Sequence, residues 1–381
     1  MVKVVRMDIE ERIELIKRKP TEELLTEENL RHLFEVGIPM QHYIGFEISG
    51  YIHLGTGLMA GAKIADLQKA GIKTRIFLAD WHSWINDKLG GDLETIQKVA
   101  LGYFKEGMKQ SIRVMGGDPD RVEFVLASEI LEKGDYWQTV IDISKNVTLA
   151  RMMRSITIMG RQMGEAIDFA KLIYPAMQVA DIYYQGVTIA HAGMDQRKAH
   201  VIAIEVAQKL KYHPLEWKGE KLKPVALHHH LLLGLQEPPV WPIQSEEQFK
   251  ELKTQMKMSK SKPYSAVFIH DTPEEIKQKL RKAFCPAKEV NYNPVLDWAE
   301  YIIFREEPTE FTIHRPAKFG GDVTYTTFEE LKRDFAEGKL HPLDLKNAVA
   351  EYLIELLKPV RDYFEKNPEP LELMREIKIT R

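Results

Sequence analysis

The chain has 381 residues, which exceeds the usual size of one hydrophobic core, so two domains are expected. Apolar residues make up 44% of the sequence and charged residues 29%, which excludes a disordered or fibrous protein. The formal net charge of −3 provides no overall attraction to nucleic acid. A nucleic-acid partner would therefore need local patches of lysine and arginine.

Membrane and export signals are missing from the sequence pattern. No uninterrupted apolar stretch approaches the roughly 18 residues that cross a bilayer. The first residues turn acidic at once and lack the apolar core of a signal peptide. Cys285 is the one cysteine, which excludes an intrachain disulfide and suits a reducing compartment. We therefore expect a cytoplasmic protein without a membrane partner.

The first quarter of the chain predicts a parallel α/β sheet. Residues 8–36 have the pattern of a charged amphipathic helix, broken by a Lys-Pro pair. A short strand is predicted at 41–46, a helix at 55–70 and a buried strand at 74–79. A strand, crossover helix and strand form a parallel pair, and such sheets are covered by helices on both faces.

Helical patterns dominate from about 92 to 183, with a further strand predicted at 122–126. Another strand is predicted at 187–190, followed by a turn and a helix. Residues 212–256 are rich in proline, and their pattern assigns no element. Within them, the histidine triplet 228–230 suggests metal, but without cysteines or spaced carboxylates we favour a loop or strand end.

Beyond about residue 266 the pattern predicts a small helical domain. Thr272-Pro273-Glu274-Glu275 is a capping box with proline at the first helical position. A second capping box opens a helix at Thr327 that stops before Gly338. Apolar residues then recur at helical spacing from 341 to 366.

The first motif with chemical meaning is His53-Leu54-Gly55-Thr56-Gly57, between the first parallel strand and its helix. Parallel sheets bind ligands at the carboxyl ends of their strands, and helix N-termini favour phosphate. Glycine lets a nucleotide approach the backbone, and His53 can donate to a phosphoryl oxygen. Taken alone, the segment is equally compatible with a glycine-rich turn that carries a surface histidine.

The second motif is Lys257-Met258-Ser259-Lys260-Ser261, about 200 positions downstream. Two lysines and two hydroxyls on one loop suit a triphosphate, because the leaving pyrophosphate gains charge in the transition state. A solvated basic loop is the alternative interpretation. The presence of both motifs in one chain favours nucleotide chemistry over this alternative.

A third pattern lies on a predicted helix. Tyr174, Gln178 and Asp181 stand at i, i+4 and i+7, which places them on one helix face. If that face points inward, a phenol, an amide and a carboxylate need polar partners there. A polar, solvent-exposed helix face is the alternative.

These motifs resemble the two signatures of the class I aminoacyl-tRNA synthetases. His53-Leu54-Gly55-Thr56 is similar to their His-Ile-Gly-His motif, and residues 257–261 match their Lys-Met-Ser-Lys-Ser motif letter for letter. Thr56 departs from the family, which usually has a second histidine there. A hydroxyl carries no charge, so more of the phosphate stabilisation is expected to fall on His53 and the loop lysines.

The helix pattern resembles the tyrosine pocket of the archaeal and eukaryotic tyrosyl-tRNA synthetases. The resemblance implies that Tyr43 and Asp181 hold the phenolic hydroxyl of L-tyrosine. It also implies that Tyr174, Gln178 and Gln196 hold the ammonium and carboxylate end.

The same resemblance implies the nucleotide contacts. Gly193 and Asp195 would touch the ribose of tyrosyl-adenylate, and Glu47 is a further tyrosine-binding candidate. ATP is the expected substrate, with Mg2+ carried on its phosphates and no metal site on the protein. The expected catalytic residues are His53, Gly55, Thr56, Lys257 and Lys260. The expected ATP-binding residues are His53, Gly55, Gly193, Asp195, Lys257, Met258, Ser259, Lys260 and Ser261.

The C-terminal part resembles the anticodon-reading domain of the same enzymes. There, an aromatic side chain stacks on the first anticodon base while a histidine and an aspartate select guanine, as single-stranded bases are usually read. Carried over, these residues are Phe319, His341 and Asp344, and Arg197 would approach the acceptor stem. The alternative makes Phe319 a core residue and His341 a simple helix start.

The expected fold class is α/β, with a Rossmann-like parallel-sheet catalytic domain at 1–264 that contains a helical connective insertion at about 92–170. A C-terminal α-helical anticodon-binding domain is expected at 265–381. The resemblance implies a homodimeric enzyme that joins tyrosine to tRNA(Tyr) at the expense of ATP. The alternatives are a tryptophanyl-tRNA synthetase, a small-molecule nucleotidyltransferase and a non-catalytic RNA-binding paralogue. The pairing of a tyrosine with an aspartate argues against the first, because an indole offers one donor and no acceptor.

Overall fold

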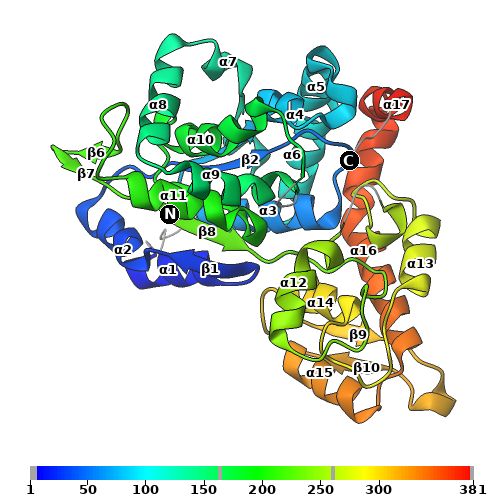
Figure 1. Cartoon of the computed structure of the whole chain (residues 1–381). Coiled ribbons are helices and arrows are strands. Elements are labelled where there is room, and N and C mark those ends of the chain that lie inside the picture. Colours follow the sequence, from blue (N-terminus) through cyan, green and yellow to red (C-terminus); the bar gives the residue numbers. More distant parts are fainter. Residues whose placement is uncertain (1–6, 162–164, 259–261, 378–381) are drawn as a thin grey trace.

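The computed structural model describes residues 7–161, 165–258 and 262–377, and its centre is a six-stranded sheet flanked by helices (Figure 1). The strand order is β1-β8-β5-β2-β3-β4. All neighbouring strands are parallel except β1, which pairs antiparallel with β8 at one edge. This arrangement confirms the predicted Rossmann-like fold. The strands are β1 Thr21–Leu25, β2 His42–Phe46, β3 Thr74–Leu78, β4 Val122–Leu126, β5 Ile189–Gly193 and β8 Val225–His229.

The prediction of a broken helix over residues 8–36 is wrong in its middle part. Helix α1 (Ile9–Lys17) and helix α2 (Glu27–Val36) form as expected, but strand β1 lies between them. Pro20 cannot donate to a continuing helix, so the chain leaves the helical path there. The strand sequence Thr-Glu-Glu-Leu-Leu has weak strand propensity, and its conformation is imposed by pairing with β8.

The unassigned region contains the hairpin strands β6 (Glu216–Trp217) and β7 (Glu220–Lys221), strand β8 and helix α12 (Glu246–Met256). Every residue of β8 is buried, because it lies between β1 and β5. His228 and His229 are the last two residues of β8, which confirms the strand-end interpretation of the histidine triplet.

Helix α3 (Leu54–Lys69) is the crossover between β2 and β3, as predicted, and glycines bring it close to α6 (Lys105–Val114). A Cβ at Gly61 would lie 2.9 Å from the backbone oxygen of Ser111, and one at Gly57 2.6 Å from its Oγ. The two glycines therefore allow the close packing of α3 against α6, which fixes the position of the α3 N-terminus. The other helices around the sheet are α4 Asp80–Ile85, α5 Leu93–Val99, α7 Ser128–Leu131, α8 Gly134–Lys145, α9 Leu149–Ser155, α10 Phe169–Tyr184 and α11 Arg197–Val206.

The C-terminal part is mostly helical, and a two-stranded sheet is added to it. Both predicted capping boxes form, at the starts of α13 and α15. Helix α15 ends at Gly338, whose φ of +79° is a conformation that glycine adopts without strain. The elements are α13 Pro273–Lys282, α14 Pro294–Trp298, β9 Phe311–Ile313, β10 Val323–Tyr325, α15 Phe328–Glu337, α16 Pro342–Lys366 and α17 Glu369–Glu376.

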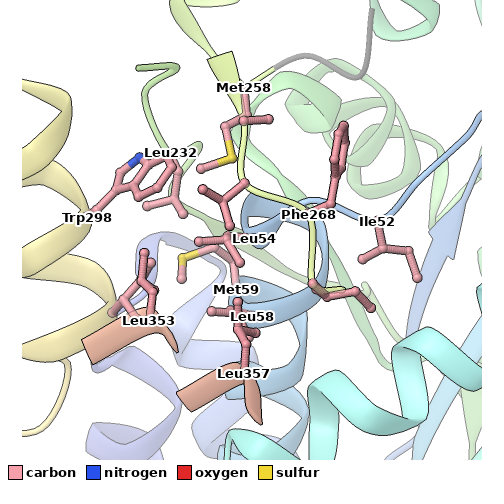
Figure 2. Close-up of a cluster of buried hydrophobic side chains, with 14 of the residues drawn as sticks. Ile52, Leu54, Leu58, Met59, Leu232, Met258, Phe268, Trp298, Leu353 and Leu357 are labelled. Carbon is pink, nitrogen blue, oxygen red and sulfur yellow. The ribbon is translucent and has the colours of Figure 1, made fainter. Parts of the chain in front are cut away.

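Helix α16 connects the two parts of the molecule, running from the C-terminal part up along the side of the sheet part (Figure 1), where it packs against α6. Its Leu353 and Leu357 belong to the same buried cluster as Leu54 and Leu58 of α3 (Figure 2). The hydrophobic core is therefore continuous across the expected domain junction, and the boundary at 264/265 stays a prediction. Within the described ranges, no helix combines the length and apolar character needed to cross a membrane.

Candidate active site

A cavity at the carboxyl ends of β2 and β5 gathers most of the predicted site residues. Residues from β2, α3, α10 and the segment that follows β5 line it. Ser259, Lys260 and Ser261 were also predicted here, but they lie outside the described residues. The predicted residues that line the cavity are Tyr43, Glu47, His53, Gly55, Thr56, Tyr174, Gln178, Asp181, Gly193, Asp195, Gln196, Lys257 and Met258.

His53 is the N-cap residue of α3. Its Nδ1 accepts a hydrogen bond from the backbone N–H of Thr56 at 3.2 Å, and its Nε2 lies 3.4 Å from the Thr56 hydroxyl. Because Nδ1 accepts, the neutral ring carries its proton on Nε2. A Cβ at Gly55 would lie 3.2 Å from the ring, so glycine allows the imidazole to lie across the first turn. The arrangement directs a donor and a hydroxyl at the helix N-terminus, where phosphate binds favourably.

Asp181 is the buried centre of one end of the cavity. The Tyr136 hydroxyl donates to its Oδ1 at 2.9 Å, and His82 Nε2 lies 2.9 Å from its Oδ2 without the alignment of a hydrogen bond. Burial is the largest single influence and lowers the pKa of His82, but contact with the Asp181 carboxylate and the charges of Asp181, Glu47 and Asp80 together outweigh it, so the net pKa is raised. Burial, and then the Asp181 charge, raise the pKa of Tyr43 well above its usual value. Tyr43 is therefore a neutral hydroxyl beside a carboxylate.

The sequence interpretation did not identify His82 and Tyr136. His82 follows β3 at the carboxyl end of a parallel strand, a position that could have marked it. Tyr136 lies in α8, far from any motif, and nothing in its sequence neighbourhood connects it to Asp181.

The cavity also contains a second carboxylate, that of Glu47. Glu47 Oε1 accepts from the Tyr174 hydroxyl and from Asn86 Nδ2, each at 2.8 Å. Gln178 Nε2 donates to Gln196 Oε1 at 3.2 Å, which leaves Gln178 Oε1 buried with no hydrogen-bond partner among the described residues. A carboxylate and a buried acceptor that line one cavity can receive a cationic group such as an ammonium.

Asp195 follows β5 and pairs with the first lysine of the basic motif. Lys257 Nζ lies 2.7 Å from Asp195 Oδ2. Burial is the largest single influence and raises the pKa of Asp195, but Lys257, with smaller effects of His229 and Gln196, outweighs it and the net pKa is lowered. Met258, the next residue, is buried in the core beside Leu232 and Trp298 (Figure 2). The methionine thereby anchors the start of the motif at the cavity.

The residues predicted to contact tRNA lie at two places. Phe319 is 60% exposed, so the interpretation as a core residue is wrong. Arg315 donates to the backbone oxygens of Gly321 at 2.8 Å and Lys339 at 3.0 Å, which brings the Phe319 loop beside the start of α16.

His341 is the N-cap residue at that start, where its Nδ1 accepts from the N–H of Leu343 at 3.1 Å, and Asp344 is in the first turn. Arg197 is at the start of α11, on the sheet part of the molecule, and donates to Glu23 at 2.9 Å. The structure therefore groups the three C-terminal residues and places Arg197 apart from them.

Comparisons with known proteins show the family to which the chain belongs. A tyrosine–tRNA ligase of Thermococcus gammatolerans is 95% identical over 98% of this chain and all of that protein. The crystal structure of a tyrosyl-tRNA synthetase complexed with L-tyrosine, from Pyrococcus horikoshii, is 87% identical with a TM-score of 0.96, covering 97% of this chain and all of that one.

A tryptophanyl-tRNA synthetase structure from Aeropyrum pernix K1 covers 93% of this chain and 85% of that one at 19% identity and a TM-score of 0.64, which shows a shared fold alone. The family model described as class I tRNA synthetases (W and Y) matches residues 37–358. The chain belongs to this family, the class I tRNA synthetases of the tryptophan and tyrosine group.

Proposed function

We propose that this protein is a tyrosine–tRNA ligase. It activates L-tyrosine with ATP to form tyrosyl-adenylate, and then transfers the tyrosyl group to the 3′ end of tRNA(Tyr), releasing AMP and diphosphate. One observation carries the choice of amino acid: the buried Asp181 carboxylate and the neutral hydroxyl of Tyr43 line the same cavity, close enough for the Asp181 charge to raise the pKa of Tyr43. A phenol both donates and accepts at one atom, as this pair requires, whereas an indole only donates.

The binding of the ammonium and carboxylate end of tyrosine follows from Glu47 and Gln178 in the same cavity. Glu47 and the unpartnered oxygen of Gln178 receive the substrate ammonium, and Tyr174 and Gln196 hold these two acceptors in place. The tyrosine carboxylate then faces the α3 N-terminus. Its oxygen attacks the α-phosphorus of ATP in line, forming a P–O bond while the bond to pyrophosphate breaks. No side chain forms a covalent intermediate, so catalysis rests on positioning and electrostatic stabilisation.

The phosphates are stabilised by groups at the helix N-terminus and by the basic motif. His53 donates through Nε2, Gly55 permits close approach, and Thr56 adds a hydroxyl. Lys257, together with Lys260 of the same motif, stabilises the negative charge that develops on pyrophosphate. Gly193 and Asp195 hold the ribose.

Mg2+ enters the proposal only as the ion carried by ATP, for which phosphate oxygens are the usual ligands. Residues 7–161, 165–258 and 262–377 contain no group of three or more histidine, cysteine or carboxylate side chains placed to hold a metal.

The transfer step needs the tRNA to reach both parts of the molecule. Phe319 is exposed for stacking on an anticodon base, and His341 and Asp344 lie at the neighbouring helix start. Arg197 is on the sheet part, where the acceptor stem would approach.

A homodimer is proposed on the evidence of an exposed apolar surface. Helices α8, α9 and α10 present Ile141, Leu149, Met153 and Phe169, the last with 75% of its surface exposed. The three helices are neighbours, since α10 contacts both α8 and α9, and large exposed apolar side chains on neighbouring helices commonly mark protein interfaces. Sedimentation of the wild type and of a Phe169→Glu, Leu149→Glu variant tests this: the variant should sediment as a monomer, and an unchanged mass in both would place the interface elsewhere.

Tyrosine-dependent exchange of pyrophosphate into ATP tests the proposed activity directly. The protein should catalyse exchange with tyrosine and not with tryptophan, and it should then charge tRNA with tyrosine. Exchange supported by tryptophan would contradict the assignment of the pocket. Tyrosine exchange without any charging of tRNA would contradict the second step.

A further inference from the structure

Three buried histidines form a hydrogen-bonded line across neighbouring parallel strands. His42 is on β2, His191 on β5 and His229 on β8. His42 Nε2 lies 3.0 Å from His191 Nδ1, and His191 Nε2 lies 2.8 Å from His229 Nδ1. At one end of the line, His42 is the residue before Tyr43 on β2. The other end reaches the cavity, which His191 and His229 line.

All three rings are neutral near neutral pH. Burial lowers the pKa of His42 to about 3 and that of His229 to about 4. Burial, with the neighbouring His229 second, lowers the pKa of His191 well below its usual value. A neutral imidazole carries one ring proton, donating at one nitrogen and accepting at the other. Two directions are therefore possible: every ring carries its proton on Nε2, or every ring carries it on Nδ1.

The buried end of the line favours one direction. His42 Nδ1 has no hydrogen-bond partner among the described residues. With protons on Nδ1, this atom would be a buried N–H donor without an acceptor, and orphaned N–H groups are rarer in proteins than unfilled acceptors. With protons on Nε2, it is only an unfilled lone pair. The arrangement with protons on Nε2 ends in a His229 Nε2–H group at the cavity.

The cavity end favours the same direction. A Cβ built on Gly193 would lie 3.5 Å from His229 Nε2 and 2.8 Å from Asp195 Oδ1, so both atoms border the same space above this glycine. Asp195 and His229 influence each other's charge, with Asp195 favouring the protonated ring. The other carboxylate oxygen of Asp195 is held by Lys257 at 2.7 Å. An N–H directed at a carboxylate is favourable, whereas a lone pair directed at it is repelled.

We propose that His229 is a positioning residue for tyrosine activation: the histidine line fixes its Nε2–H toward Asp195, and thereby holds that carboxylate ready for a ribose hydroxyl of the nucleotide. The role of Asp195 in this inference rests on the proposed function. The direction of the histidine line does not, because it follows from the orphaned nitrogen of His42 and from the charge of Asp195.

NMR of the whole protein, labelled with 15N on the histidine rings, tests the direction of the line. Spectra of His42→Phe and His229→Phe assign the signals. We expect the ring proton on Nε2 in His42, His191 and His229 of the wild type. A proton on Nδ1 in these rings, or a doubly protonated ring near neutral pH, would overturn the inference. The measurement needs no substrate, so it succeeds or fails independently of the proposed function.

Two conservative variants separate positioning from simple packing. The amide nitrogen of glutamine reaches the place of the histidine Nε2, whereas that of asparagine reaches the place of Nδ1. His229→Asn should therefore raise the KM for ATP about 10-fold, equivalent to about 1.4 kcal/mol. His229→Gln should restore most of this loss. The KM for tyrosine should stay within about twofold in both variants, because a single contact on the ribose side is affected.

His228→Asn is the matched control, because His228 is the adjacent buried histidine of β8 and pairs instead with His200 and Glu23. Its KM for ATP should be unchanged. Equal losses in His229→Gln and His229→Asn, or equal losses for ATP and tyrosine, would overturn the positioning role. If His229→Asn does not fold, His42→Phe replaces it. This change removes the first donor of the line and should also raise the KM for ATP more than the KM for tyrosine.

Discussion

At the scale of single residues, the site is defined by pairs of groups that hold each other before any substrate arrives. Asp181 already has Tyr136 on one oxygen and His82 beside the other. Asp195 already has Lys257. A carboxylate offers about four acceptor sites, so each retains capacity toward the cavity while its orientation is fixed. Such preorganisation lowers the cost of ordering side chains when the substrate binds.

The sequence could predict the residues that belong to motifs, but not their partners. Tyr174, Gln178 and Asp181 share a helix face that points inward, as their spacing indicated. Tyr136 and Asn86, unlike His82 at the carboxyl end of β3, acquire their roles only through contacts across the fold, from segments without a distinctive local pattern. Their roles depend on tertiary distance, which one sequence does not encode visibly.

Lys257→Ala should slow tyrosine activation while leaving tyrosine binding nearly unchanged. Charge on pyrophosphate peaks in the transition state, so the lysine contributes there more than in the ground state. We expect kcat for pyrophosphate exchange to fall about 10- to 100-fold and the KM for tyrosine to stay within about twofold. Lys262→Ala, an exposed lysine of the same segment, is the control and should behave as wild type. Parallel losses of rate and tyrosine affinity would show that Lys257 instead shapes the tyrosine pocket.

At the scale of elements, sequence periodicity identified the helices and strands whose local pattern agrees with the structure that their surroundings impose. The core strands β2, β3 and β4 and the capped helices α13 and α15 are of this kind. Strand β1 was missed because its composition suits a helix, and only the edge of β8 makes it a strand. Strand β8 was missed because its buried histidines interrupt the apolar run expected of an inner strand.

Gly61→Ala should destabilise the protein although alanine favours helices. The added Cβ would lie 2.9 Å from a backbone oxygen of α6, which cannot move aside as a side chain can. Overpacking typically costs about 1–3 kcal/mol, which exceeds the gain of about 1 kcal/mol in helix propensity. Urea unfolding measures the difference. Gly102→Ala is the control, since nothing lies within 4 Å of its Cβ position, and it should be neutral or stabilising. A stabilised Gly61→Ala variant would mean that α3 and α6 can separate freely.

At the scale of the whole molecule, a buried ionic cluster joins segments that are distant in the sequence. Asp66 of α3 pairs with Lys63 at 2.9 Å, with Arg305 of the C-terminal part at 3.0 Å, and with Arg18 of the N-terminal segment. Lys63 and Asp66 are fully buried. The cluster and the continuous core around α16 explain why the two predicted domains pack as one body.

Asp66→Ala should therefore destabilise the molecule by about 3–5 kcal/mol, because it leaves buried cations without their counter-charge. Urea unfolding followed by two probes, one in each part, measures the loss and shows whether both parts still unfold together. Glu94→Ala is the control: it removes the exposed pair with Lys98, which solvent screens, and should leave the free energy of unfolding nearly unchanged. Equal effects of the two variants would mean that the cluster is solvated and contributes little.

Asp344→Ala tests the division of labour between the two parts. The side chain lies in the first turn of α16, away from the cavity residues. We expect a higher KM for tRNA and a weaker preference for guanine at the first anticodon position, by about 1–3 kcal/mol. Pyrophosphate exchange without tRNA should be unchanged. Retained discrimination between guanine and the other bases would make Asp344 a structural residue of the helix start.

The most direct test of the account is selection against phenylalanine, which fits the pocket and lacks only the hydroxyl. Tyrosyl-tRNA synthetases are themselves the established example of this selectivity, so the magnitude of the discrimination is not a prediction of the geometry. The geometry predicts which residues produce it. The measurement is kcat/KM for tyrosine and phenylalanine in wild type, Tyr43→Phe and Asp181→Asn. The ratio of kcat/KM for tyrosine to kcat/KM for phenylalanine should fall at least about tenfold in each variant, because a hydrogen bond to a charged group is removed. Most of the change should be a lower kcat/KM for tyrosine. An unchanged ratio in both folded variants would contradict the assignment of Tyr43 and Asp181 to the phenol.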